Sequence, residues 1–160
     1  MTGPMQQEPA YVLHRRPWRE TSLMVDVFSL NAGRVTVIAR GGNSAKSPLK
    51  AQLQPFQPLL LDWTGRSDLK TLTQADVRSG PTLKRTLSLY SGLYVNELLQ
   101  RLLPMADPHH QLFAAYIDVI AELSEASDVE PVLRRFEQSL AAELGYDFVW
   151  DQAMDSGQPV

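Results

Sequence analysis

The sequence contains no cysteine among its 160 residues. This absence excludes disulfide bonds and cysteine-ligated zinc within these residues. No apolar run approaches the roughly 18 residues that a membrane-spanning helix needs. The N-terminal stretch MTGPMQQEPA lacks both a basic and an apolar segment, so it is not typical of a signal peptide. We therefore expect a cytoplasmic protein that does not bind a membrane.

Sequence patterns of catalysis and metal binding are also absent. There is neither a Gly-x-Ser-x-Gly nucleophile turn nor a Gly-x-x-x-x-Gly-Lys phosphate loop. His109 and His110 are adjacent, so on a helix they would point about 100° apart and make a poor pair of metal ligands. We therefore expect no enzymatic activity, no metal site and no cofactor.

The composition is that of an ordinary globular protein, with 44% hydrophobic and 21% charged residues, but the charge is unevenly distributed. Residues 1–80 carry ten Lys/Arg and six Asp/Glu, whereas residues 81–160 carry five and twelve. A basic half joined to an acidic half indicates a polyanion-binding module attached to a second part. The alternative is that the acidic half is merely solvated.

Short strands are predicted for the first half. Apolar and polar residues alternate with a period of two in residues 22–28 and 34–39, and Asn31 and Gly33 favour a tight turn between them. These patterns predict a hairpin over residues 22–40. Further candidate strands are residues 11–14, 56–63 and 68–77. Five short strands joined by turns predict a small closed barrel, because closure removes exposed sheet edges.

After Gly80 the pattern becomes helical. One amphipathic helix is indicated by apolar residues that recur every three or four positions, namely Leu83, Leu87, Tyr90, Tyr94 and Leu98. A second helix is predicted after Asp107 as N-cap, and a third after Asp128, ending at Gly145. We therefore divide the chain into a disordered lead-in (1–9), a barrel domain (10–80), an incomplete helical domain (81–150) and a polar tail (151–160).

The candidate nucleic-acid-binding residues are the basic side chains of the barrel half and one tryptophan among them. Basic side chains that neutralise phosphates release counterions, which supplies most non-specific affinity. A tryptophan beside them can stack on an unpaired base, an interaction worth roughly 1–3 kcal/mol. The alternative is a solvated barrel rim with the ring held against the core. The candidates are Arg15, Arg16, Trp18, Arg19, Arg34, Arg40, Lys46, Lys50, Arg66 and Lys70.

One basic spot lies in the acidic half, where Arg134 and Arg135 interrupt a run of acidic and apolar residues. This pair is suited to dock an acidic peptide. The alternative is a surface pair in which an arginine forms an ion pair with a nearby glutamate.

An ordered set of segments resembles the RecO family of bacterial DNA repair proteins. No single segment is decisive, but together they run in order from about residue 10 to residue 150. The segments are 11–22 (YVLHRRPWRETS), 33–35 (GRV), 39–42 (ARGG), 53–56 (LQPF), 69–72 (LKTL), 89–99 (LYSGLYVNELL), 133–137 (LRRFE) and 144–146 (LGY).

The resemblance implies an N-terminal OB-fold followed by a helical domain, which is an α+β architecture. It implies a recombination mediator that binds single- and double-stranded DNA and anneals complementary strands. Together with RecR, such a mediator helps to load RecA onto DNA coated by single-stranded DNA-binding protein. The helical domain would contact the acidic tail of that protein, and the location would be cytoplasmic and nucleoid-associated.

The chain departs from the family pattern in two respects. Family members usually continue well beyond the equivalent of Val160, so we expect an incomplete helical domain. Some members also carry a cysteine-ligated zinc, which this sequence does not support. Two alternatives stay open from the residues alone: an OB module that binds only proteins, and RNA as the natural ligand.

Overall fold

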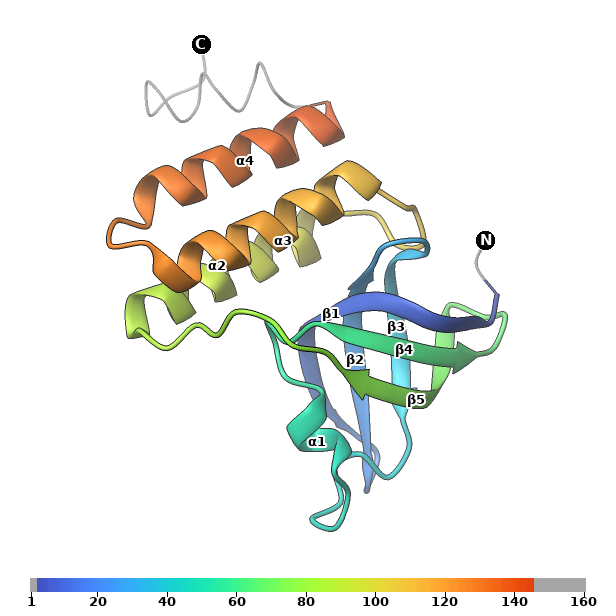
Figure 1. Cartoon of the computed structure of the whole chain (residues 1–160). Coiled ribbons are helices and arrows are strands. Elements are labelled where there is room, and N and C mark those ends of the chain that lie inside the picture. The colour runs from blue at the N-terminus through green and yellow to red at the C-terminus, as the bar shows by residue number, and fades with distance from the viewer. Residues whose placement is uncertain (1–2, 146–160) are drawn as a thin grey trace.

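The computed structural model describes residues 3–145, and its two halves differ in kind (Figure 1). The first half is a closed barrel with the strand order β1-β2-β3-β5-β4. β3 and β5 pair in parallel, and the other neighbouring strands pair antiparallel. The predicted α+β architecture, a five-stranded OB-fold barrel followed by helices, is confirmed. The strands are β1 (Met5–Trp18), β2 (Ser22–Ser29), β3 (Gly33–Ala39), β4 (Leu59–Thr64) and β5 (Leu69–Val77).

Alternating side chains build the barrel wall. In β2, Leu23, Val25 and Val27 point inward and are at most 2% exposed. The intervening residues face outward, because successive side chains of a strand lie on opposite faces. The predicted hairpin over residues 22–40 is present as β2 and β3, whose pairing ends at Ser29 and Gly33.

The N-terminal strand is longer than the sequence predicted. β1 begins at Met5, and Glu8 pairs with Leu61 of β4, inside the stretch expected to be a disordered lead-in. The Glu8 carboxylate is buried and accepts hydrogen bonds from the backbone N–H of Asn31 (2.5 Å) and from its side-chain amide (3.0 Å). Both interactions join residues far apart in sequence, so local composition carries no sign of them.

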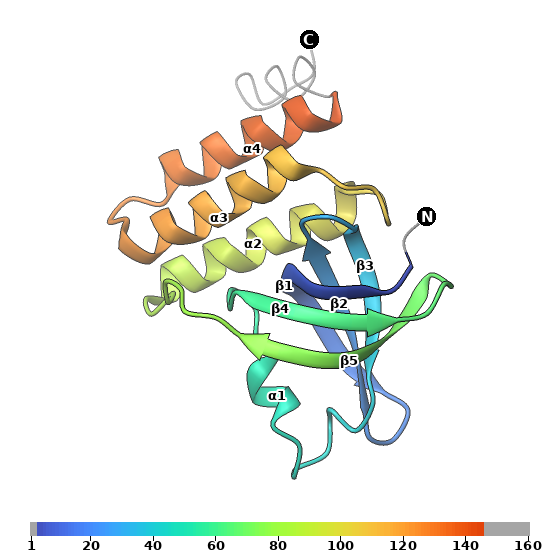
Figure 2. The same ribbon diagram turned by 45° about the vertical axis from the view of Figure 1, so that its right-hand side comes forward.

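Three helices form a layer beside one end of the barrel, with α3 between α2 and α4 (Figure 2). Their bounds are α2 (Thr86–Leu102), α3 (His110–Glu125) and α4 (Glu130–Leu144). Gly145 adopts the left-handed conformation (φ 81°) that was predicted after the third helix. The predicted N-cap of α3 is wrong, since the helix begins at His110 with His109, not Asp107, before it. Within residues 3–145, no helix combines the length and apolarity needed to cross a membrane.

One aromatic cluster joins the helices to the barrel. Tyr11 of β1 and Phe28 of β2 meet Phe113 and Tyr116 of α3, with ring centroids 5.0–6.0 Å apart. Aromatic pairs at these separations stabilise a core beyond their buried area. The barrel interior has a core of its own, and a second hydrophobic core, shared with the helices, covers the outer face of β1 and β2.

The face of α2 that packs inward is not the one marked by its large apolar residues. Its buried residues are Ser88, Ser91, Gly92, Val95, Asn96 and Leu99. Small side chains let the helix approach closely, and a Cβ built at Gly92 would lie 2.7 Å from the ring of Phe56. The predicted helix is present. However, Tyr90, one of the regularly spaced apolar residues from which the helix was predicted, is 67% exposed.

A joint of polar contacts fixes the β2–β3 hairpin to the end of α2. The Arg34 guanidinium donates to the carbonyls of Leu103 (3.1 Å) and Gln100, which α2 leaves without helical partners. Its Nε lies 3.6 Å from Asp26 Oδ1, and the N–H of Ala106 donates to the Arg34 carbonyl (2.7 Å). These contacts hold the barrel at one orientation to the helices.

Candidate nucleic-acid interface

The tip of the β1–β2 hairpin presents an aromatic ring together with a cation. Trp18 is the last residue of β1, and the Arg19 guanidinium lies 5.4 Å from the centroid of its ring. Arg19 adopts a positive φ of 56°, which is uncommon for a residue with a side chain and marks the tight reversal of the chain. This turn brings the two side chains together.

Three segments distant in sequence meet at this tip and form a cleft of about 390 Å³. They are the β1–β2 turn, the end of β3 and the start of β5. The cleft brings together four of the predicted residues, Trp18, Arg19, Arg40 and Lys70. Its other lining residues are Thr21, Ser22, Ile38, Gly41, Leu69 and Thr71. Sequence reasoning missed these, although each lies at a strand end beside a turn, which was the available signal.

Lys70 is a buried residue in the wall of this cleft. The residue is 3% exposed, and its ammonium donates to the carbonyl of Gly65 at 3.3 Å. The contact ties the start of β5 to the β4–β5 turn. Arg66 lies in that same turn and is exposed, but it does not line the cleft.

Arg15 supports the neighbouring loop. Its guanidinium donates to the carbonyl of Leu53 (2.9 Å) and to that of Lys50, at the end of the short helix α1 (Leu49–Gln52). The sequence predicted only a loop as far as Lys50. Arg15 thereby holds a segment that carries two further predicted residues, Lys46 and Lys50, both of which are exposed.

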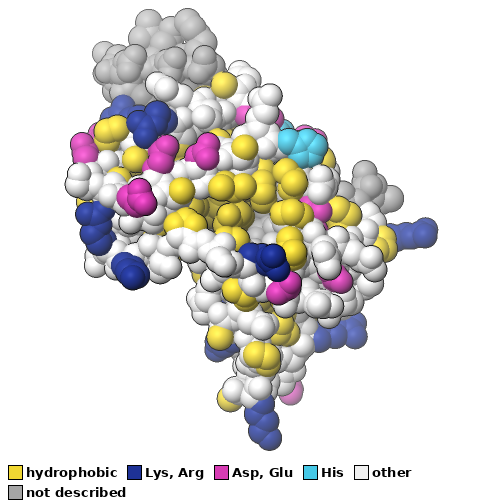
Figure 3. Space-filling model, in the orientation of Figure 1, with side chains coloured by type: hydrophobic (Ala, Val, Ile, Leu, Met, Phe, Trp, Pro, Cys, Tyr) yellow, Lys and Arg dark blue, Asp and Glu magenta, His cyan; other side chains and the backbone are white. Residues whose placement is uncertain are grey.

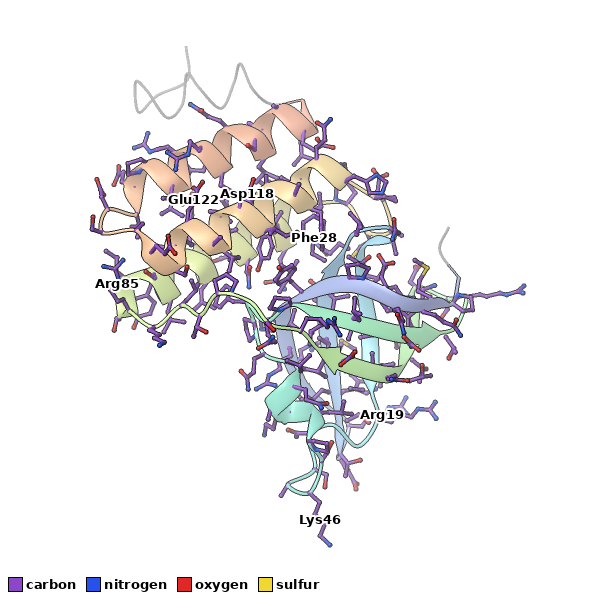
Figure 4. All side chains as sticks on the ribbon, viewed as in Figure 1. Arg19, Phe28, Lys46, Arg85, Asp118 and Glu122 are labelled. Atoms are coloured by element: carbon purple, nitrogen blue, oxygen red, sulfur yellow. The ribbon has the colours of Figure 1, made fainter. Side chains whose placement is uncertain are left out.

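Some of the exposed cations lie at the barrel end that points away from the helices. Figure 4 shows Arg19 and Lys46 there, and Figure 3 shows a basic side chain projecting from the lowest point of the barrel. Most of these side chains are not neutralised by protein carboxylates. Within residues 3–145, no ion pair is formed by Arg16, Arg19, Arg40, Lys46, Lys50 or Arg66.

Arg34 occupies a different place from the rest of the predicted set. Its guanidinium is bound in the joint with α2 and its side chain is 17% exposed. The structure therefore assigns it to the packing of the barrel on the helices.

In the helical half, Arg134 and Arg135 lie on α4 and both form ion pairs. Arg135 Nη2 lies 2.9 Å from Glu122 Oε1, and Arg134 Nη2 lies 3.2 Å from Glu130 Oε1. Arg135 also borders a groove of about 230 Å³ between α3 and α4. Figure 4 shows Glu122 and Asp118 on α3 at this groove, whose apolar floor is formed by Val119, Val132 and Phe136.

The buried carboxylate of Glu137 lies beneath this basic pair. It is 5% exposed and accepts a hydrogen bond from the Tyr94 hydroxyl. Burial and this carboxylate raise the pKa of Tyr94 above its ordinary value, so the phenol stays protonated and donates. Among the described residues, no three His, Asp or Glu side chains are grouped so that they could hold a metal ion.

Comparisons with known proteins match the whole chain. The family model described as "Recombination protein O N terminal" matches residues 1–81, and "Recombination protein O C terminal" matches residues 84–160. Proteins named DNA repair protein RecO are 64% identical in Marinobacter nauticus, 48% in Nitrosospira multiformis and 47% in Aromatoleum aromaticum. These alignments cover 100%, 97% and 98% of this chain but 66%, 64% and 65% of the relatives. The chain thus spans slightly less than two thirds of their length.

Proposed function

Because this chain belongs to the RecO family of recombination proteins, we propose that it acts in recombinational DNA repair by binding DNA on its barrel. The observation that carries this proposal is the cleft at the β1–β2 tip, where Trp18, Arg19 and Arg40 converge. OB-folds that bind single strands commonly combine cations along the path of the nucleic-acid backbone with aromatic rings that stack on the bases.

The mechanism proposed is annealing without bond chemistry. Arg and Lys side chains neutralise the phosphates of single- and double-stranded DNA, which lowers the repulsion between two strands. The exposed bases of the two complementary strands can then pair with each other. No catalytic residue, metal or cofactor is needed for this, and the protein would work in the cytoplasm on the nucleoid.

The proposal extends to protein partners. With RecR, the protein would help to load RecA onto DNA coated by single-stranded DNA-binding protein. The acidic tail of that protein would bind on α4 beside the α3–α4 groove, where Arg134 and Arg135 would exchange their glutamate partners for tail carboxylates. The apolar floor beside Arg135 supports this site.

A fluorescence anisotropy titration with labelled single-stranded DNA at several salt concentrations tests the barrel. A phosphate-binding protein shows log K falling with log salt, with a slope of about −0.7 per phosphate contact for a single strand. Arg19→Ala together with Arg40→Ala should weaken binding and make the slope shallower by about 1.4. Arg78→Ala is the matched control, because Arg78 is an exposed barrel arginine that already pairs with Asp76 at 3.5 Å.

The alternative is an OB module that binds only proteins. Absence of any DNA binding at low salt and micromolar protein would favour it over our proposal. Competition between DNA and RNA strands of matched sequence decides the second alternative, in which RNA is the natural ligand.

A further inference from the structure

The outer face of α2 leaves large apolar side chains in contact with solvent. Tyr90 is 67% exposed, Leu87 59% and Leu93 46%, and Leu89 and Tyr94 are each 38% exposed. A contiguous apolar patch on a protein surface commonly marks a place where something binds. None of the residues predicted for DNA or partner binding belongs to this face.

Part of this face forms a groove against the barrel, which we call the α2 groove. It has a volume of about 370 Å³ and is lined by Gln54, Pro55, Phe56, Thr86, Leu89, Tyr90 and Leu93. Phe56 has a positive φ of 70°, a strained conformation for a bulky residue, and its ring is held at Gly92. Strain of this kind concentrates at binding sites, and here it gives the groove a fixed wall.

The charge around the α2 groove has one sign. The residues that line the groove are uncharged. The flanking stretches 40–61 and 79–96 together contain five Lys or Arg and no Asp or Glu. Lys50, Lys84 and Arg85 are exposed and, within residues 3–145, form no ion pair. Figure 4 shows Arg85 at the start of α2, remote from Arg19. The occupant that complements these cations is a polyanion.

Two further observations favour a nucleic acid over an acidic protein. Tyr90 offers an exposed aromatic ring within the groove, and such a ring stacks on a base of any sequence. The groove also borders a basic loop, because the Gln54 amide donates to the carbonyl of Lys50 (3.1 Å), in the same loop as Lys46. Exposed cations therefore lie on the loop beside the groove as well as at the start of α2.

We propose that the α2 groove binds a second single strand of nucleic acid while the barrel cleft binds the first. Bases of this strand stack on Tyr90 and against Leu89 and Leu93, and its phosphates contact Lys50, Lys84 and Arg85. The inference rests on the proposed function, since the first strand is the one bound at the barrel.

The test uses the whole chain and two non-complementary oligonucleotides with different fluorophores. The first strand is added to saturation, and the second is titrated while energy transfer between the labels reports the ternary complex. Lys84→Ala with Arg85→Ala should weaken second-strand binding about tenfold and make its salt slope shallower by about 1.4. Tyr90→Ala should weaken second-strand binding by roughly fivefold or more.

Two controls isolate the α2 groove. Arg101→Ala removes a cation of the same helix that is paired with Glu97 at 2.7 Å, and it should leave the ternary complex unchanged. First-strand affinity should stay the same in every variant, and circular dichroism confirms that each one folds.

Each other outcome overturns the inference. Second-strand binding that survives both groove variants places the second strand elsewhere, while the barrel proposal stands. If no strand binds the unaltered chain, the barrel proposal and this inference fail together. If a polyglutamate peptide binds in a Tyr90-dependent way and no second strand does, the groove serves an acidic protein.

Discussion

Arg15 and Arg19 belong to the same predicted basic loop, but their guanidinium groups do different things. Arg15 donates to backbone carbonyls of Lys50 and Leu53, whereas Arg19 lies over Trp18 at the rim of the cleft. Composition alone could place both in a basic cluster. Composition could not distinguish their roles, because the two carbonyls that Arg15 binds lie in another part of the sequence.

This difference predicts opposite effects of two alanine variants. Arg15→Ala should lower the free energy of unfolding by about 1–2 kcal/mol, because two hydrogen bonds from a charged donor are lost, one of them partly buried. Arg19→Ala should leave stability within about 0.5 kcal/mol and weaken DNA binding instead. Urea denaturation and the anisotropy titration measure the two quantities, and equal effects on stability would contradict the assignment.

Gly92 is a second position where one atom matters. A methyl group there would lie 2.7 Å from the Phe56 ring and 2.9 Å from Leu83 Cδ1, so Gly92→Ala should destabilise the protein by about 1–3 kcal/mol. Gly3→Ala is the control, since nothing lies within 4 Å of the added atom. Thermal unfolding compares them, and a Gly92→Ala protein as stable as the control would show that Phe56 can move.

Asp26 should make stability depend on pH. Burial raises the pKa of its carboxyl above 3.8, and Arg34, the Gln100 amide and His14 offset only part of this effect. The folded state therefore holds its proton more tightly than the unfolded state, and this contribution falls as pH rises from about 3.8 through the raised pKa. Relative to the natural chain, Asp26→Asn should gain stability as the pH rises from about 3 to about 7. Denaturation at both pH values checks this, and a difference independent of pH would contradict it.

At the scale of elements, α2 shows what periodicity can and cannot predict. The recurrence of Leu87, Tyr90 and Tyr94 correctly indicated a helix but marked its exposed face. Buried Asn96 explains the reversal, because its amide donates to the Leu13 carbonyl (3.3 Å) and accepts from the Tyr116 hydroxyl (2.6 Å). Small and polar residues can bury a helix face when their partners are supplied by other elements.

The strands were easier to predict, because each presents its own alternation. The exceptions arise from pairing between distant segments. The first residues of β1 are held by pairing with β4, and the end of α1 is held by hydrogen bonds from Arg15. The candidate site followed the same rule: its cations were visible in the sequence, but their gathering into one cleft depends on the barrel closing.

The joint between β3 and α2 should be sensitive as a unit. Arg34→Met removes donors from the last carbonyls of α2 and leaves Asp26 without its cation, so it should destabilise the protein by about 2–3 kcal/mol. Adding Asp26→Asn should restore part of this loss, because the unpaired charge is gone. Hydrogen exchange in the last turn of α2 should accelerate in Arg34→Met. Additive effects of the two substitutions would contradict the coupling.

At the scale of the whole molecule, the shared core makes the barrel depend on the helices. Tyr11, Leu13 and Phe28 are at most 7% exposed because α2 and α3 cover them. A fragment of residues 3–80 would expose these side chains, each worth about 1.5–3 kcal/mol of burial. We expect the fragment to unfold several kcal/mol more easily than the whole chain in urea. Equal stability would show that the barrel is an independent unit.

The asymmetry of charge also has its meaning at this scale. The sequence indicated a basic half and an acidic half, and the structure places unpaired cations both at the far end of the barrel, as with Arg19 and Lys46, and at the start of α2, as with Arg85 (Figure 4). On α3 and α4, Glu122 and Glu130 pair with the two arginines of α4. Net charge does not predict where the unpaired charges lie, because the fold determines which charged side chains form ion pairs.

The chain from Gly41 to Gln54 has a consequence for the surface between two bound strands. It leaves the barrel cleft at Gly41, is fastened at its far end by Arg15, and enters the α2 groove at Gln54. It thus covers the surface between the two sites, and the packing of the barrel on α2 sets the gap between two strands. Changing the length of this loop would therefore alter the surface that lies between two strands and leave the distance between the two sites unchanged.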